Sequence, residues 1–173
     1  MLKLFQEGIL SVGRFFTMRN NRLKIILGIA TAVIAVVAIM FGFAAAFGDI
    51  RSYPAGRGSM FQIMFGGRGY NNVPALVVAF VFFIVAAVFA IASSFLPGKL
   101  GLIGFGLVAL LLAAGGIMVF FTTNLFTSAN ADVISSQSLQ ENPITAGVGV
   151  YGMGITAIVG AVLSFYCARL SAK

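Results

Sequence analysis

Histidine and tryptophan are absent from this chain of 173 residues, which contains one cysteine and four acidic residues. Only 9% of the residues are charged, whereas about 25% are charged in a typical soluble domain. This scarcity of charge excludes an ordinary soluble globular protein, and the single cysteine excludes a disulfide scaffold. Hydrophobic residues make up 60% of the chain and its mean hydropathy is +1.06, which excludes disorder. The class that remains is an integral membrane protein.

The same absences restrict the chemistry that we expect. Transition-metal sites use clustered His, Cys, Asp or Glu side chains, and here Cys167 stands without a histidine. A nucleophile–base pair lacks its usual histidine base, and no carboxylate lies inside an apolar run. We therefore expect no enzymatic activity, no catalytic residue, no cofactor and no bound metal. Cys167 is interpreted as a packing residue, with palmitoylation as the alternative.

Four apolar runs are long enough to cross a bilayer, which requires roughly 20 residues. They cover about residues 23–47, 74–96, 100–122 and 144–168. Lys24 lies in the first turn of the first run, where its side chain can extend back to the headgroups. The sequence predicts an all-α integral membrane protein with a bundle of four transmembrane helices, and residues 96–100 leave room only for a tight hairpin. A cleaved signal peptide over residues 1–46 is the alternative, and it would leave three spans.

The basic residues are distributed unequally between the two sides of these spans. Eight lie on the side of the termini and three (Arg51, Arg57 and Arg68) on the other, so the positive-inside rule places both termini in the cytoplasm. We expect a basic rim that anchors the protein to anionic lipid, and no nucleic-acid partner. A bacterial plasma membrane is inferred from the short chain and from the absence of an N-x-[ST] site. The rim consists of Arg14, Arg19, Arg22, Lys24, Lys99 and Arg169.

The leader at residues 1–22 has an amphipathic pattern. Its apolar residues recur at intervals of three and four, and polar residues take the opposite side. This pattern predicts a helix in the membrane interface, followed by a turn over residues 18–22 into the first span. A docking helix for a partner subunit is the alternative. The apolar residues are Leu2, Phe5, Ile9, Val12 and Phe16.

The first predicted external loop, residues 48–73, contains a short apolar run between ends rich in Gly, Pro and Asn. An exposed run of this kind requires a covering surface. Covering by the membrane interface or by its own bundle is favoured for this run. A contact surface for another protein is the alternative, and on that reading the run is a candidate external contact. The residues concerned are Met60, Phe61, Ile63, Met64 and Phe65.

Small residues follow one another at four-residue intervals along the fourth span. Such a stripe lets helix backbones approach closely, and packing within one chain is favoured over packing between chains. The stripe consists of Gly152, Thr156, Gly160, Ser164 and Ala168. A G-x-G-x-x-G string at residues 147–152 is interpreted as a packing feature, because dinucleotide binding requires a preceding strand and a soluble helix.

These observations favour a non-enzymatic accessory or structural subunit of a membrane complex. Its expected partners are membrane lipid and either other membrane subunits or further copies of itself. The topology resembles that of claudin-like tetraspan proteins and of the small membrane subunits of tripartite solute carriers. The first loop lacks the tryptophan and paired cysteines of claudins, so no residue role is transferred. The alternative is a small oligomeric channel, which could be lined by Thr122, Thr123, Asn124, Tyr151 and Thr156.

Overall fold

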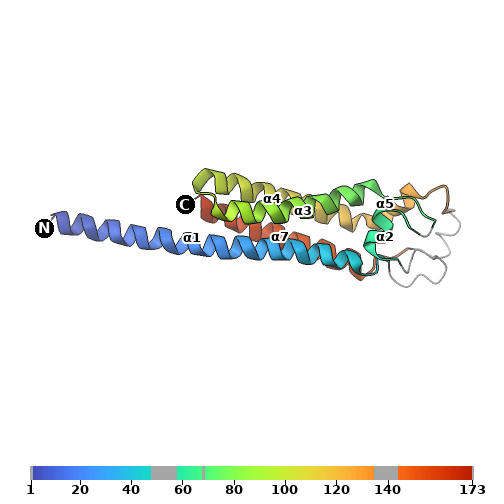
Figure 1. Cartoon of the computed structure of the whole chain (residues 1–173), viewed down its shortest axis with the longest axis horizontal. Helices are drawn as coiled ribbons and strands as arrows, with labels where there is room; N and C mark the ends of the chain where they lie inside the picture. Colours follow the sequence, from blue (N-terminus) through green and yellow to red (C-terminus); the bar gives the residue numbers. More distant parts are fainter. Residues whose placement is uncertain (1, 48–57, 68, 135–143, 173) are drawn as a thin grey trace.

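A computed structural model describes residues 2–47, 58–67, 69–134 and 144–172, with side chains from residue 21 onward. The described residues form an elongated helical bundle (Figure 1). Its long helices are α1 (Leu2–Met40), α3 (Pro74–Phe95), α4 (Gly98–Phe120) and α7 (Val148–Ser171). Shorter elements are the 3₁₀ helix η1 (Phe41–Phe43), α2 (Met60–Met64) and α5 (Thr122–Ala129).

Four helical segments are long and apolar enough to cross a membrane, which confirms the four predicted runs. They cover Asn21–Phe43, Pro74–Phe95, Gly98–Phe120 and Val148–Ser171. The shortest has 22 residues and is about 33 Å long at 1.5 Å per residue, enough for a hydrocarbon core of about 30 Å. The described part of the chain therefore has the architecture of a multi-pass integral membrane protein.

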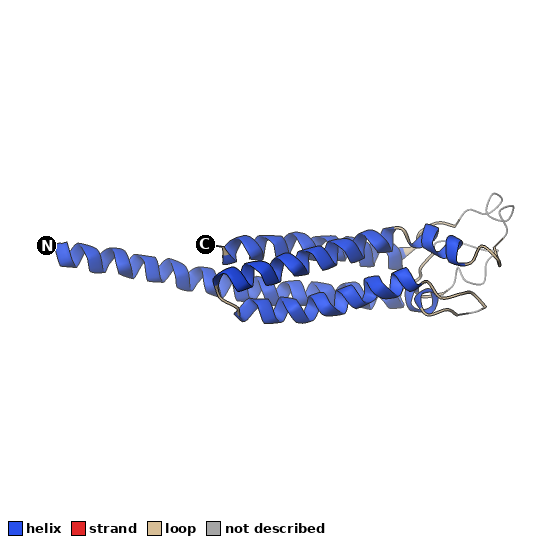
Figure 2. Cartoon of the chain, turned by 90° about the horizontal axis from the view of Figure 1, so that it is seen from above, coloured by secondary structure: helices blue, strands red, loops and turns tan. Residues whose placement is uncertain are grey.

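The first and last helices differ from their expected bounds. α1 is continuous from Leu2 to Met40, so the turn expected over residues 18–22 is not formed, and its first half projects beyond the other helices (Figure 2). Asn20 and Asn21 lower helix propensity only slightly, and neither is a proline that would break the helix. The interfacial position of residues 1–22 stays a prediction. α7 begins at Val148 instead of near residue 144, because the residues before it are extended.

Each long helix runs antiparallel to its two neighbours in the order α1, α3, α4, α7 around the bundle. We call the end where α3 passes into α4 the terminal end, because α7 also ends there, and the opposite end the loop end (Figure 1). The turn between α3 and α4 is as tight as expected. Gly98 occupies the left-handed region there, with φ of 50°, a conformation that favours glycine.

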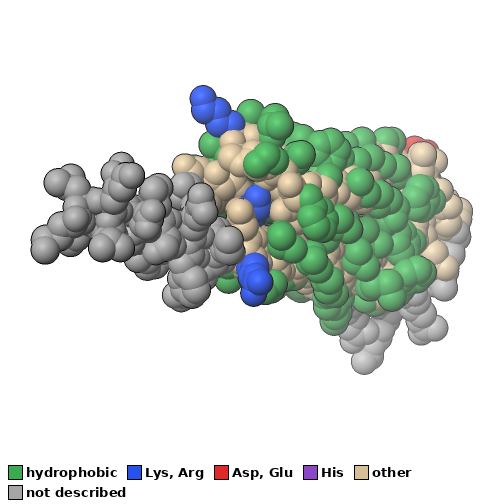
Figure 3. Space-filling view, turned by 60° about the vertical axis from the view of Figure 1, so that its left-hand side comes forward, with side chains coloured by type: hydrophobic (Ala, Val, Ile, Leu, Met, Phe, Trp, Pro, Cys, Tyr) green, Lys and Arg blue, Asp and Glu red, His purple; other side chains and the backbone are tan. Residues whose placement is uncertain are grey.

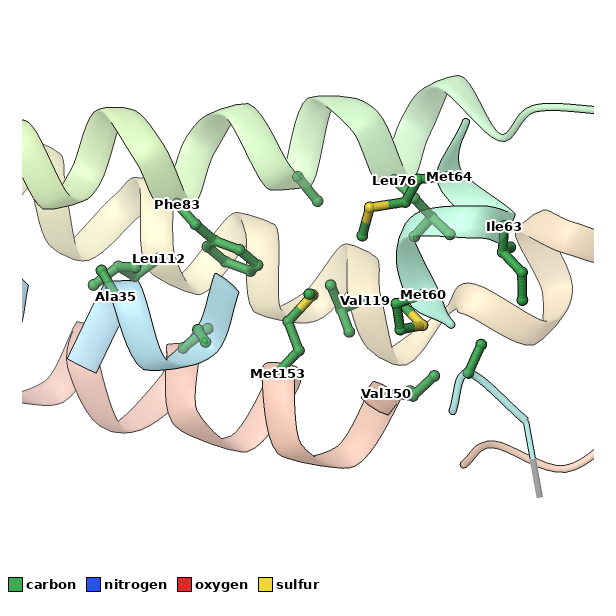
Figure 4. Close-up of a cluster of buried hydrophobic side chains, with 14 of the residues drawn as sticks. Ala35, Met60, Ile63, Met64, Leu76, Phe83, Leu112, Val119, Val150 and Met153 are labelled. Carbon is green, nitrogen blue, oxygen red and sulfur yellow. The ribbon is translucent and has the colours of Figure 1, made fainter. Parts of the chain in front are cut away.

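The interior of the bundle is filled by apolar side chains from all four long helices. Phe83, Leu112 and Met153 are fully buried, and Figure 4 shows Phe83 between the other two along the bundle. Alanines such as Ala35 and Ala79 are also fully buried and let the helices approach closely. This core continues into the loop end, where Figure 4 places Met60 and Met64 of α2 beside the ends of the long helices.

Two isolated β-bridges connect extended segments of the chain at the loop end. Ala45 forms an isolated antiparallel bridge with Ser59, and Phe47 forms another with Ala146. The first span therefore ends at Phe43, before its predicted limit at Phe47. Part of the expected second loop is helical, because Thr122 and Phe126 of α5 lie four residues apart on one buried face.

Candidate functional site

The small-residue stripe of α7 packs inside this chain, against α1 and α4. A Cβ atom built at Gly160 would lie 3.0 Å from Leu112 Cδ1 and 3.1 Å from Ile34 Cγ2. One at Gly152 would overlap the ring of Phe41. Further along, Ser164 Oγ donates a hydrogen bond of 2.8 Å to the Phe105 carbonyl oxygen. Ala168 is buried and Thr156 is half-buried, so all five residues belong to, or border on, contacts within one chain.

Two adjacent serines of α3 make comparable contacts with glycines of the neighbouring helices. Ser94 Oγ occupies the space that a side chain at Gly28 of α1 would fill, and Ser93 Oγ does the same opposite Gly104 of α4. These adjacent serines thus contact two different helices, and each contact is made at a glycine of the neighbouring helix. The Ser-Ser pair was a visible signal, but its glycine partners can be identified only in three dimensions.

The apolar run of the first loop forms α2 and turns inward. Met60, Ile63 and Met64 are buried, so these three side chains contact their own bundle, which is one of the two favoured arrangements, and do not form the candidate external contact. The inward orientation follows from helix geometry, because residues three and four apart share one face. A capping box between Ser59 and Gln62 begins this helix.

Phe61 of α2 and Phe65, which follows this helix, contact aromatic rings of neighbouring elements. The Phe61 ring lies 4.7 Å from that of Phe43 and 5.0 Å from that of Phe80, both edge to face. The Phe65 ring lies 6.4 Å from Phe80, and this side chain remains 58% exposed. Of the five candidate contact residues, Phe65 alone is exposed, and Phe61 is half-buried.

The glycine-rich string at the start of α7 lies against the backbone of the extended segment that follows the first span. Gly147 N donates a 2.8 Å hydrogen bond to the Ala46 carbonyl oxygen, and Gly149 N donates one of 2.7 Å to that of Ala45. A Cβ atom at Gly149 would lie 2.8 Å from the Ala45 oxygen and 2.9 Å from the Ala44 oxygen. These glycines are therefore required for close backbone approach.

A polar network connects the two loops at the loop end. Asn71 N donates to Asn130 Oδ1 at 2.6 Å, and Asn71 Nδ2 donates to the Ala129 carbonyl oxygen at 3.1 Å and to Asp132 Oδ1 at 3.3 Å. Asn130 is fully buried, and its Nδ2 donates to the Phe126 carbonyl oxygen at 2.9 Å. Asn71 and Asn130 lie 59 residues apart, so their pairing was not visible in the sequence.

Removing the Asn130 side chain is expected to loosen this end of the molecule. In Asn130→Ala the backbone N–H of Asn71 loses its acceptor in a partly buried site, which costs about 1 kcal/mol of unfolding free energy. Amide hydrogen exchange of α5 and of residues 69–73 measures the effect, with exposed Asn124→Ala as the matched control. Unchanged protection in Asn130→Ala would show that the network does not hold the loops together.

The residues of the basic rim differ in their exposure and in their contacts. Arg22, Lys99 and Arg169 are exposed, and the Arg169 guanidinium lies 5.3 Å from the centre of the Phe165 ring. Lys24 is 5% exposed, and its Nζ donates a 2.7 Å hydrogen bond to the Leu96 carbonyl oxygen at the end of α3. Lys24 therefore joins α1 to α3 and does not reach lipid as we expected. The side chains of Arg14 and Arg19 lie outside the described residues.

No cluster of three or more His, Cys, Asp or Glu side chains occurs within the described residues. Cys167 is buried and free. Of the residues considered for a channel, Thr122 is buried with its hydroxyl donating to the Val119 carbonyl oxygen, whereas Asn124 and Tyr151 are exposed, and Thr123 and Thr156 are half-buried. This chain matches no protein-family model, no curated protein and no solved structure.

Proposed function

We propose that this protein is a non-enzymatic accessory subunit of a membrane complex and acts through its surfaces. The observation that carries the proposal is the use of polar side chains inside the spans. Thr31, Ser94 and Ser171 donate to carbonyl oxygens of their own helices, at 2.7–3.0 Å. Ser164 and Lys24 bond neighbouring helices, and within the described spans Ser93 Oγ is the buried side-chain oxygen without a partner.

Apart from Ser93, the buried polar side chains of the described spans are thus paired inside the bundle. Its outer surface is apolar (Figure 3). Large exposed side chains such as Val88, Ile103 and Val162 face outward at membrane depth. In lipid such a surface offers contacts to acyl chains or to other helices. We further propose that the terminal end faces the cytoplasm of a bacterium, because the rim residues lie there.

The mass of the complex, extracted gently from its native membrane, tests this proposal. We expect a different subunit at fixed stoichiometry, identified from the co-purifying chains. A closed homo-oligomer would overturn the accessory role in favour of the channel, and flux into liposomes would then be measured. A monomer would overturn both.

A pair of variants tests whether the partner subunit contacts Phe65. Phe65 is the exposed member of the apolar run, and its replacement by alanine is expected to lower recovery of the partner about tenfold, the effect of losing an aromatic anchor. Phe121→Ala is the matched control, because Phe121 is similarly exposed (54%) at the same end of the bundle. Equal recovery with both variants would place the contact elsewhere.

A further inference from the structure

An apolar groove of about 470 Å³ lies on the outer surface between α1 and α3. Ala32 of α1 and Ala87 of α3 form its floor and are nearly buried, whereas Ile91 and Phe95 of α3 form one wall and are exposed. All of these residues belong to the predicted spans, so the groove lies at the depth of the hydrocarbon core. Its volume is within the range of about 300–1,000 Å³ that is typical of small-molecule sites.

The other wall of the groove lies on the same face of α1 as an arginine. Ile29, Val33 and Val36 line the groove, and they follow Arg22 by seven, eleven and fourteen residues. These intervals place all four side chains on one helical face. Arg22 is exposed and lies about 10 Å beyond Ile29 toward the terminal end, at 1.5 Å per residue.

The terminal end of the bundle is positively charged, and Arg22 is the basic residue that lies on the face of the groove. Arg22, Lys99 and Arg169 are exposed at this end, and Figure 3 shows basic side chains beside the hydrophobic band there. Among the side chains that the structure describes, Asp132 is the acidic one, and it lies at the loop end. The groove thus combines an apolar lining at membrane depth with the Arg22 guanidinium near its terminal end.

We propose that this groove binds an anionic phospholipid, with one acyl chain between α1 and α3 and the phosphate at Arg22. A guanidinium forms paired, charge-assisted hydrogen bonds with phosphate oxygens. A second copy of the chain fits the groove less well, because close helix packing in lipid requires small residues along the contact. Here alanines form the floor and bulky Val, Ile and Phe side chains form the walls, which keep a helix away but admit a single hydrocarbon chain.

Native mass spectrometry of the purified full chain tests the proposal. The protein is titrated with phosphatidylglycerol or phosphatidylcholine carrying identical acyl chains. We expect one phosphatidylglycerol to be retained per chain, with an affinity about tenfold above that for phosphatidylcholine. Arg22→Gln is expected to remove this preference. Both headgroups carry a phosphate, but phosphatidylglycerol is a net anion, whereas the choline ammonium of phosphatidylcholine offsets the phosphate charge and is repelled by Arg22. Arg169→Gln is the charge-matched control and should keep it.

A second variant tests the position of the acyl chain. Val33→Trp fills the groove from an exposed wall position and should lower retention of both lipids, whereas Val88→Trp, at an exposed α3 position outside the groove, should not. Circular dichroism verifies that both variants stay folded. Equal lipid retention in the two tryptophan variants, or equal headgroup preference in the two glutamine variants, would overturn the proposal. A two-chain species dissociated by Val33→Trp would also overturn it, by assigning the groove to a second copy.

Discussion

Alanine in place of Gly149 is expected to cost about 3 kcal/mol of unfolding free energy, at the upper end of the usual overpacking penalty. The added methyl group would meet the carbonyl oxygens of Ala44 and Ala45, and backbone oxygens cannot rotate away as a side chain can. Relief requires α7 to move away from the end of the first span. That movement would stretch the 2.7 Å hydrogen bond from Gly149 N to Ala45 O.

Cys167 provides the measurement for this variant. It is the one cysteine of the chain and is fully buried, so its alkylation by a maleimide reports unfolding in mixtures of a mild detergent with dodecyl sulfate. Gly149→Ala should lower the dodecyl sulfate fraction at the midpoint of unfolding. Gly106→Ala is the control, because a Cβ atom there has no neighbour within 4 Å, and alanine favours the helix. Identical midpoints would show that α7 is not held by this backbone contact.

Reversing the charge of Lys24 is expected to have an equally large effect. In Lys24→Glu a carboxylate replaces the ammonium that donates to the Leu96 carbonyl oxygen at 2.7 Å. Leu96 caps the C-terminus of α3, where the helix dipole favours a cation and disfavours an anion. An unpaired buried charge costs about 3–5 kcal/mol, and we expect a loss of unfolding free energy in this range.

Two further variants separate charge from hydrogen bonding at this position. Arg22→Glu makes the same change of charge two residues earlier on an exposed side chain, and should alter the midpoint of Cys167 alkylation little. Lys24→Gln keeps a donor and should lie between Lys24→Glu and the unchanged protein. If Lys24→Glu and Arg22→Glu unfold at the same midpoint, the Lys24 hydrogen bond does not stabilise the bundle.

The spans and the α3–α4 hairpin could be predicted because both depend on local composition. Continuous apolar runs identify helices in a membrane whatever their neighbours are, and residues 96–100 are too few for another connection. The direction in which an apolar loop faces could not be predicted, because it does not depend on local composition. The run containing Met60 and Met64 could cover its own bundle or a partner, and only the position of α2 over the core decides between them.

The interactions that were missed join residues far apart in the chain. Lys24 and Leu96 are 72 residues apart, and a lysine near the membrane boundary ordinarily extends to the headgroups. The continuity of α1 was also hidden, because periodicity on either side of residues 18–22 does not reveal whether the helix bends between them. In the α7 stripe, spacing identified the small residues but not the ring of Phe41 or the side chain of Leu112 against them.

The hydrogen bonds from Gly147 to Ala46 and from Gly149 to Ala45 have a consequence for biosynthesis. They join the segment that directly follows the first span to the start of α7, across about a hundred residues of chain. While the ribosome is still adding residues of α7, the faces of α1 and α4 that receive this helix are exposed to lipid. Closure of the bundle therefore follows insertion of the final helix, and a truncated translation product would present those faces to membrane quality-control proteases.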